Sequence, residues 1–185
     1  MKSDGYPFLD REMVVLIDPN DREIGQMEKL EAHRTGRLHR AFSVFIFNAQ
    51  GELLLQQRAA NKYHSASLWT NTCCGHPRPG EALVAAGERR LEEEMGLHVP
   101  LRPAFHFTYA AKLEDGLTEH ELDHVLIGRS DRDPRPDPEE AADWRWVDRA
   151  TLEGELAAHP GLYTVWFLLC VKAAWEHADG MTVQA

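Results

Sequence analysis

The segment at residues 41–48, AFSVFIFN, places the strongest constraint on what this chain can fold into. It is almost wholly apolar and rich in Phe, Val and Ile, which is typical of a strand buried within a sheet. A turn at residues 48–51 and a second run, ELLLQQR at residues 52–58, follow directly. We therefore predict a hairpin of two strands, the first of them deeply buried.

The remaining segments supply both strands and helices. Further strands are predicted at residues 13–18, 105–112, 121–128 and 144–147, with a turn at Asp115-Gly116. Helices are predicted at residues 81–95, ending at Gly96, and from residue 160 to about residue 177. Residues 27–35 fit a loop or a short helix, and residues 60–69 and 131–137 fit loops. The expected fold class is α/β or α+β, a mixed β-sheet sandwiched between helices, in one domain at residues 1–185 with its core at about 13–178.

Composition limits the partners and the location of the protein. The formal net charge of −10 argues against nucleic-acid and anionic-membrane partners, which favour basic surfaces, but allows a small anionic substrate in a local basic pocket. Residues 1–11 hold no apolar run like a secretory signal, and the longest apolar stretch, about residues 163–171, is too short to cross a membrane. We expect a soluble, cytoplasmic protein whose three cysteines, Cys73, Cys74 and Cys170, are reduced thiols.

A spaced pattern covers the helix predicted at residues 81–95 and the loop before it. It consists of Gly75, Glu81, Arg89, Leu91, Glu93, Glu94, Gly96 and Leu97. This pattern resembles the Nudix box, G-x5-E-x7-R-E-U-x-E-E-x-G-U, where U is an apolar residue. One position departs, because Arg90 stands where the box has Glu. In Nudix hydrolases that Glu belongs to the acidic set that holds magnesium, so its replacement disfavours diphosphate hydrolysis.

The charged residues of this helix also have a simpler interpretation. Glu92, Glu93 and Glu94 cannot all face one site, because successive residues rotate by about 100° around a helix. A solvated helix face, with Arg90 and Glu94 forming a surface ion pair four residues apart, would account for the run. The spacing from Gly75 to Glu94 within the box favours a functional role for Glu94.

A second pattern lies at residues 69–77, WTNTCCGHP. It resembles the W-T-N-x-x-C-G-H-P signature of the type I isopentenyl-diphosphate isomerases, which belong to the Nudix superfamily. Further residues that match this family are Lys29, His33, His39, Arg58, Lys62, Tyr109, Glu119, Glu121 and Trp166. The resemblance runs from about residue 13 to residue 170. It implies a Nudix-type fold and an enzyme of isoprenoid biosynthesis that interconverts isopentenyl diphosphate and dimethylallyl diphosphate.

The alternation of side chains along an extended chain indicates which of these residues face the same way. Residues two apart in a strand point the same way, which places Cys74 beside His76, with Cys73 opposite, and Glu119 beside Glu121. A set of three imidazoles and two carboxylates is a plausible site for a divalent transition metal: His33, His39, His76, Glu119 and Glu121. The chain has ten histidines, so a packed or solvated imidazole remains the alternative for each one.

The resemblance also implies ligands for two metal ions and for the substrate. The five-residue set would hold one zinc or manganese ion, and a magnesium ion would bridge the substrate diphosphate to Glu94 and the backbone carbonyl of Cys74. The residues that would hold phosphate oxygens are Lys29, Arg58, Lys62 and Arg90, each of which could instead be a solvated surface cation. The diphosphate is the small-molecule partner expected, and the chain would be a monomer or a weak homodimer.

Isomerisation of an unactivated alkene adds one proton and removes another through a carbocation-like intermediate. It therefore needs an acid and a base on opposite faces of the carbon frame, in a dry site. The resemblance implies that Glu121 with Tyr109 supplies one proton and that Cys74, as a thiolate, removes the other; the immediate donor could be either Glu121 or Tyr109. The ring of Trp166 would face the cation, although an aromatic residue in an apolar helix is often a core residue.

Three other functions fit parts of the sequence. A Nudix hydrolase of a nucleoside or isoprenoid diphosphate is disfavoured by Arg90 and by Cys74 next to the box. A non-enzymatic Nudix-fold binding module would lack some catalytic positions, yet Cys74, Tyr109, Glu121 and Trp166 are all present. A structural zinc domain would need a closed ligand set rich in cysteine, which this chain does not offer.

Overall fold

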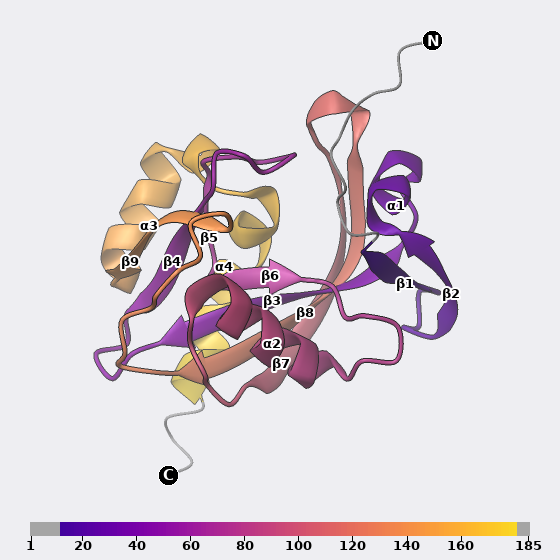
Figure 1. Cartoon of the computed structure of the whole chain (residues 1–185). Coiled ribbons are helices and arrows are strands. Elements are labelled where there is room, and N and C mark those ends of the chain that lie inside the picture. The colour runs from indigo at the N-terminus through magenta and orange to yellow at the C-terminus, as the bar shows by residue number, and fades with distance from the viewer. Residues whose placement is uncertain (1–11, 181–185) are drawn as a thin grey trace.

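A computed structural model describes residues 12–180 and shows a mixed sheet covered by helices on both faces (Figure 1). Its strands are β1 (Met13–Ile17), β2 (Glu23–Glu28), β3 (His39–Phe47), β4 (Leu53–Arg58), β5 (Trp69–Thr70), β6 (Cys73–Gly75), β7 (Arg102–Lys112), β8 (Thr118–Arg129) and β9 (Ala141–Val147). Its helices are α1 (Lys29–Thr35), α2 (Leu83–Met95), α3 (Arg149–Ala158) and α4 (Val165–Gly180), with short 3-10 turns η1 (Glu114–Gly116) and η2 (Pro160–Leu162). The expected fold class is confirmed.

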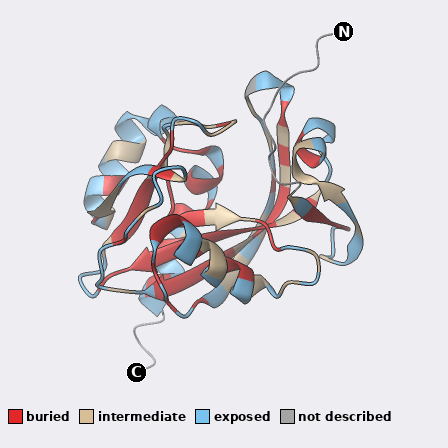
Figure 2. Cartoon of the chain, viewed as in Figure 1, coloured by how far each residue is buried: buried red, intermediate tan, exposed pale blue. Residues whose placement is uncertain are grey.

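Strand β3 lies inside the sheet, as its apolar sequence predicts. It pairs in parallel with β8 along its whole length, and antiparallel with β6. Its side chains alternate between two cores: Phe42, Val44 and Ile46 pack on the side of α2, and Phe45 and Phe47 pack on the side of α4. Because both faces are covered, almost every residue of the strand is buried (Figure 2).

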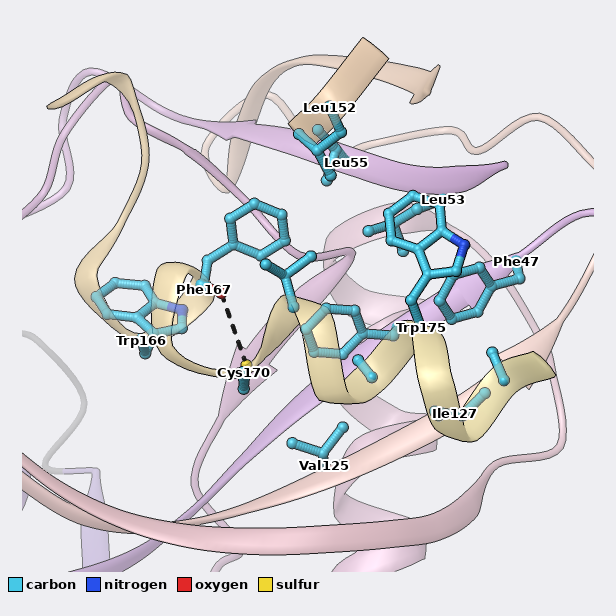
Figure 3. Packing of buried hydrophobic residues seen from close by; sticks show 14 of the residues in the cluster. Phe47, Leu53, Leu55, Val125, Ile127, Leu152, Trp166, Phe167, Cys170 and Trp175 are labelled. Carbon is cyan, nitrogen blue, oxygen red and sulfur yellow. Dashed lines mark hydrogen bonds between the residues drawn. The ribbon is translucent and has the colours of Figure 1, made fainter. Parts of the chain in front are cut away.

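One core lies between the sheet and α4 (Figure 3). Residues from both sides meet in it, including Phe47, Leu53, Leu55, Val125, Ile127, Leu152, Phe167, Cys170 and Trp175. Trp166 lies near the start of α4, at one end of this group and away from Trp175 (Figure 3). The apolar helix therefore anchors the sheet and also carries Trp166 to the edge of the core.

The other core lies between the sheet and α2. Leu91 and Met95 of this helix are fully buried. Gly87 allows the close approach, because a Cβ there would lie 2.5 Å from a methyl carbon of Leu126. The helix ends at Gly96 in the left-handed conformation, with φ of 64°, as the sequence predicts. This packing fixes the helix that carries Arg90 and Glu94.

Several sequence expectations differ from the structure in extent. The predicted hairpin of residues 41–48 and 52–58 is confirmed only next to its turn, where β3 and β4 pair antiparallel at Phe47 and Leu53. Over the rest of its length β4 pairs with β9. The last helix begins at Val165, after the turn η2, and not at Pro160. Strand β2 and helix α3 were not predicted, because few of their residues are buried and neither has a regular apolar face in its sequence.

The hairpin of β7 and β8 extends past the rest of the sheet and lies beside α1 (Figure 1). Nδ1 of His120 on β8 lies 3.1 Å from the carbonyl oxygen of Gly36, just after α1. Helix α1 is thus held beside β8, and its residue His33 lies close to Glu121 of that strand. Residues 1–11, where we expect no apolar leader, lie outside the described part. Within residues 12–180, no helix has both the length and the apolar character needed to cross a membrane.

Candidate active site

Strand pairing brings distant motifs to one end of β3. His39, the first residue of β3, lies opposite Glu121 of β8, and Ser43 lies opposite Cys74 of β6. Eleven predicted residues line one cavity there: Lys29, Arg58, Lys62, Cys74, His76, Arg90, Glu94, Tyr109, Glu119, Glu121 and Trp166. His33 and His39 do not line the cavity, but both contact Glu121. The structure thus brings together all of the residues predicted for the site.

Three imidazoles and one carboxylate converge in a compact group. Oε1 of Glu121 lies 3.0 Å from Nε2 of His76, 3.3 Å from Nε2 of His39 and 3.7 Å from Nε2 of His33. The ligand atoms of all four residues lie within 4.8 Å of one another, and all four residues are buried. Nitrogen and oxygen donors of this kind suit a divalent transition metal.

The hydrogen bonds of the imidazoles fit metal binding. Nδ1 of His39 lies 2.8 Å from the carbonyl oxygen of Arg37, which can only accept, so Nδ1 carries a hydrogen and Nε2 is the nitrogen available to a metal. Nε2 of His33 is buried without a hydrogen-bond partner. Nε2 of His39 and Nε2 of His76 are only 3.2 Å apart. A cation among these atoms would satisfy them together.

Glu119 lies beside this group, and its carboxylate is not among the four converging ligands. Its Oε2 lies 3.0 Å from the hydroxyl of Tyr109, and its Oε1 lies 3.6 Å from Nε2 of His64. The same Tyr109 hydroxyl lies 2.7 Å from Oε2 of Glu121. One phenolic proton can therefore be donated to either of two carboxylates.

Burial and neighbouring groups separate the pKa values of these side chains. Burial would raise the pKa of Glu121, but its contacts with the three imidazoles hold that pKa well below its usual range. Burial and the charge of Glu121 raise the pKa of Glu119 well above its usual range. Burial lowers the pKa of His76 to about 4, so that this ring is neutral at pH 7, as a metal ligand must be.

The adjacent cysteines point to opposite sides of β6, as the period of a strand predicts. Cys73 is 0% exposed and packs in the core on the side of α2. Cys74 lines the cavity. Burial raises the pKa of Cys74, although the positive charge of Arg58 acts in the opposite direction. Burial therefore disfavours the thiolate, and proton removal by Cys74 requires positive charge within the site, such as that of Arg58, to favour it.

The part of the cavity next to α2 holds paired charges. Arg90 Nη2 lies 2.6 Å from Oε1 of Glu94 and 3.2 Å from Oε2 of Glu140, which also binds Lys62. Glu94 is 4% exposed, and its second oxygen accepts from Gln56 at 2.8 Å. The pair of Arg90 and Glu94 is thus part of the cavity wall and not the solvated ion pair considered above. These cations can bind phosphate oxygens, and the two carboxylates can face a metal.

Two further cations lie on other walls of the cavity. Lys29 forms an ion pair of 2.5 Å with Glu12. Arg58 donates to the carbonyl oxygens of His64 and Ser65, and its guanidinium lies 5.4 Å from the ring centroid of Trp166. Two of its five N–H groups are therefore committed to the loop between β4 and β5, and the others are available for an anion.

Comparison with known sequences identifies the family. Residues 37–167 match the model of the NUDIX domain. The chain is 52% identical over 161 residues to the isopentenyl-diphosphate Delta-isomerase of Serratia proteamaculans, covering 87% of this chain and 90% of the relative. It is 53% identical over 173 residues to the enzyme of the same name from Burkholderia multivorans, covering 90% and 98%. The chain belongs to the isopentenyl-diphosphate Delta-isomerase family.

Two solved structures share the fold of this chain. A protein from Deinococcus radiodurans aligns with a TM-score of 0.67 at 23% identity, covering 80% of this chain and 90% of that one. The MutT protein from Methanosarcina mazei aligns with a TM-score of 0.62 at 20% identity, covering 77% and 95%. At these identities the likeness concerns the fold alone. Together with the match of residues 37–167 to the NUDIX domain, it confirms the Nudix-type architecture expected from the box.

The cavity of this isomerase family member includes residues that sequence reasoning missed. They are Glu12, Ser43, Gln56, Tyr63, His64, Asp123 and Glu140. Asp123 could have been found, because it continues the period of two that groups Glu119 and Glu121 on β8. Tyr63 and His64 follow Lys62 directly, in a segment that we expected only to be an irregular loop. Glu140 has no spacing signal, since the loop before β9 brings it to Arg90 only in three dimensions.

Proposed function

We propose that this chain interconverts isopentenyl diphosphate and dimethylallyl diphosphate in isoprenoid biosynthesis, by adding a proton at one carbon and removing a proton from another. The observation that carries the proposal is the arrangement of the cavity. A cysteine, a tyrosine shared by two glutamates, and a cluster of cations line the same cavity. These are the groups that proton transfer and diphosphate binding require.

The chemistry needs a proton at the terminal carbon of the alkene. Tyr109 faces the cavity with its hydroxyl between Glu119 and Glu121, so a proton that leaves the phenol can be replaced from a neighbouring carboxyl. Protonation leaves a tertiary carbocation at C3. Loss of a proton from C2 then forms the new double bond, and Cys74 is the group we assign to accept it. In the reverse direction the two proton transfers exchange roles.

The cation must be protected from water while it exists. Trp166 is 3% exposed and lies at the edge of the core, where its indole N–H lies 3.2 Å from the side-chain oxygen of Asn71. This hydrogen bond fixes the orientation of the ring. An aromatic face in a dry site attracts the positively charged intermediate but not the uncharged alkene. The ring therefore stabilises the transition state more than the bound substrate.

The residues present fit the metals that the family implies. His33, His39, His76 and Glu121 would hold a zinc or manganese ion, with Glu119 as a further ligand, and Glu94 with the carbonyl of Cys74 would hold magnesium on the diphosphate. When bound, these ions would add positive charge beside Glu121 and neutralise charge on the phosphates. Lys29, Arg58, Lys62 and Arg90 would hold phosphate oxygens and so position the alkene between Tyr109 and Cys74.

The proposal is tested by incubating isopentenyl diphosphate with the protein, magnesium and zinc or manganese. Proton NMR should show the terminal alkene signals replaced by the two methyl signals of dimethylallyl diphosphate. A parallel phosphate assay, with nucleoside diphosphate compounds included, should show no hydrolysis above the blank. Release of phosphate without isomerisation would favour a Nudix hydrolase instead.

The setting of the activity is part of the proposal. The substrate and product are small and water-soluble, and the formal net charge of −10 does not favour an anionic surface as a partner. We therefore place the enzyme in the cytoplasm, as a monomer or a weak homodimer. Sedimentation of the pure protein over a range of concentrations would distinguish these two states from a stable oligomer.

A further inference from the structure

Tyr63 contacts both parts of the site without belonging to any motif in the sequence. It lies in the loop between β4 and β5, directly after Lys62, and it lines the cavity. Its hydroxyl lies 3.1 Å from Nδ1 of His33, and the two rings are stacked with centroids 6.2 Å apart. Nζ of Lys29 lies 5.6 Å from the centroid of the same tyrosine ring. A single side chain thus contacts a candidate metal ligand and a candidate phosphate-binding residue.

The two residues that Tyr63 contacts come from one short helix. Lys29 and His33 are four residues apart on α1, so their side chains lie on the same face of it. Within the described residues, the contacts that fix the end of the Lys29 side chain are the ion pair with Glu12 and the approach to the Tyr63 ring. The loop between β4 and β5 therefore reaches across the cavity and holds this face of α1 through Tyr63.

The hydrogen bond to His33 has a direct consequence for metal binding. Nε2 of His33 points toward Glu121 and has no hydrogen-bond partner, so it is the nitrogen that is available to a metal. When Nε2 of a neutral imidazole binds a metal, Nδ1 must carry the hydrogen, and that N–H needs an acceptor. The phenolic oxygen of Tyr63 is the acceptor that the structure supplies. His33 is 1% exposed, so a water molecule cannot easily take the place of the Tyr63 hydroxyl as the acceptor.

We propose that Tyr63 is a positioning residue, whose hydroxyl orients His33 for the transition metal and whose ring holds Lys29 for the diphosphate. This inference rests on the proposed function, because it assigns His33 to the metal and Lys29 to the substrate. The two contacts use different parts of one side chain. Substitutions can therefore separate them: Tyr63→Phe removes the hydroxyl and keeps the ring, whereas Tyr63→Leu removes both.

The first measurement is zinc affinity, determined by competition with a chromophoric chelator, without substrate or turnover. Removing a group that supports a metal-bound histidine typically weakens metal binding by about 10- to 100-fold, and we expect Tyr63→Phe to show a loss in this range. The visible spectrum of the cobalt-loaded protein should change in the same variant, because the orientation of one ligand changes. Tyr163→Phe is the matched control, since it removes a hydroxyl that contacts Arg145 and Glu155, none of which lines the cavity.

The second measurement is the affinity for inorganic pyrophosphate with magnesium, determined by calorimetry. Tyr63→Phe should bind pyrophosphate as the wild type does. Tyr63→Leu should bind it roughly two- to fivefold more weakly, the size expected for a partly exposed cation–π contact. A loss that appears in both variants equally would show that the ring does not act on Lys29 and would overturn that half of the proposal.

Other outcomes separate this inference from the function on which it rests. Equal zinc affinities in wild type and Tyr63→Phe would overturn the role of the hydroxyl, even in an enzyme that isomerises its substrate. Equal losses of zinc affinity in Tyr63→Phe and Tyr163→Phe would show a general structural effect and would also overturn it. A wild-type protein that binds no zinc, manganese or cobalt would contradict the metal site of the proposed function itself.

Discussion

Arg90 lies 2.6 Å from Glu94 across one turn of α2, at the position where the Nudix box has a glutamate in place of this arginine. The substitution replaces a potential metal ligand with a cation that faces the cavity. Gly75 makes room for it, because a Cβ there would lie 3.3 Å from Cγ of Arg90. In this chain, α2 therefore presents Arg90 to phosphate oxygens at the position where a Nudix hydrolase has a metal-binding glutamate.

Replacing Arg90 should weaken substrate binding more than it slows the chemistry. Hydrogen bonds to charged groups contribute about 1.5–3 kcal/mol, so Arg90→Ala should raise KM for isopentenyl diphosphate by roughly 10- to 100-fold. Arg89→Ala is the control, since Arg89 binds Glu81 and Glu93 outside the cavity and should leave KM near that of the wild type. Steady-state kinetics decides the case. An unchanged KM in Arg90→Ala would remove Arg90 from the substrate site.

The two adjacent cysteines should differ sharply in their effect on turnover. Cys74 lines the cavity, whereas Cys73 is buried in the core on the side of α2. Cys74→Ala should reduce kcat by about 10²- to 10⁴-fold, the contribution typical of a general base. Cys73→Ala should keep most of the activity and lose some thermal stability, because it leaves a small void in a packed core. If Cys73→Ala were inactive and Cys74→Ala active, the facing assignment would be wrong.

Trp166 should affect rate more than substrate affinity. A desolvated cation–π contact is worth about 2 kcal/mol, or roughly thirtyfold in rate. The expected order of kcat is wild type, then Trp166→Phe, then Trp166→Leu, with similar KM values. Because the guanidinium of Arg58 also lies over this ring, Phe is the cleaner replacement. Circular dichroism would establish that both variants fold. If Trp166→Leu folds and has the kcat of the wild type, Trp166 only packs in the core and does not stabilise the cation.

Glu81 should act on stability and not on catalysis, although it belongs to the Nudix box. Both of its oxygens accept from Arg89, and these hydrogen bonds lower the pKa of Glu81 below its ordinary value of 4.5. A lowered folded-state pKa gives stability that is present above pH 4.5 and is lost as pH falls through the folded-state value. Glu81→Gln should therefore be less stable at pH 7, by less than about 1 kcal/mol because solvent screens the pair.

Urea unfolding at a series of pH values would measure this difference. The stability curves of wild type and Glu81→Gln should converge as the pH falls below 4.5. A difference that stays constant with pH would assign the loss to packing and not to the charge of Glu81. A large loss of kcat at pH 7 with no loss of stability would place Glu81 in the active site, contrary to the geometry.

The residues that sequence reasoning grouped into a site lie together in the structure, whereas the bounds of several predicted elements differ from those observed. Cys74 and Glu121 could be placed because short motifs and the period of a strand fix which way each side chain points. Strand β2 and helix α3 could not be predicted, because they bury few residues and so carry little hydrophobic periodicity. The same limit applies to Glu140 and Tyr63, whose roles depend on loops that approach the cavity in three dimensions.

The central claim is that one proton enters and another leaves within this cavity, without cleavage of the diphosphate. The most direct measurement is NMR of isopentenyl diphosphate incubated in D2O with the protein, magnesium and zinc or manganese. We predict dimethylallyl diphosphate with one deuterium from solvent in a methyl group at its first formation, and no phosphate release. Free phosphate without isomer, or isomer that carries no deuterium, would contradict the account.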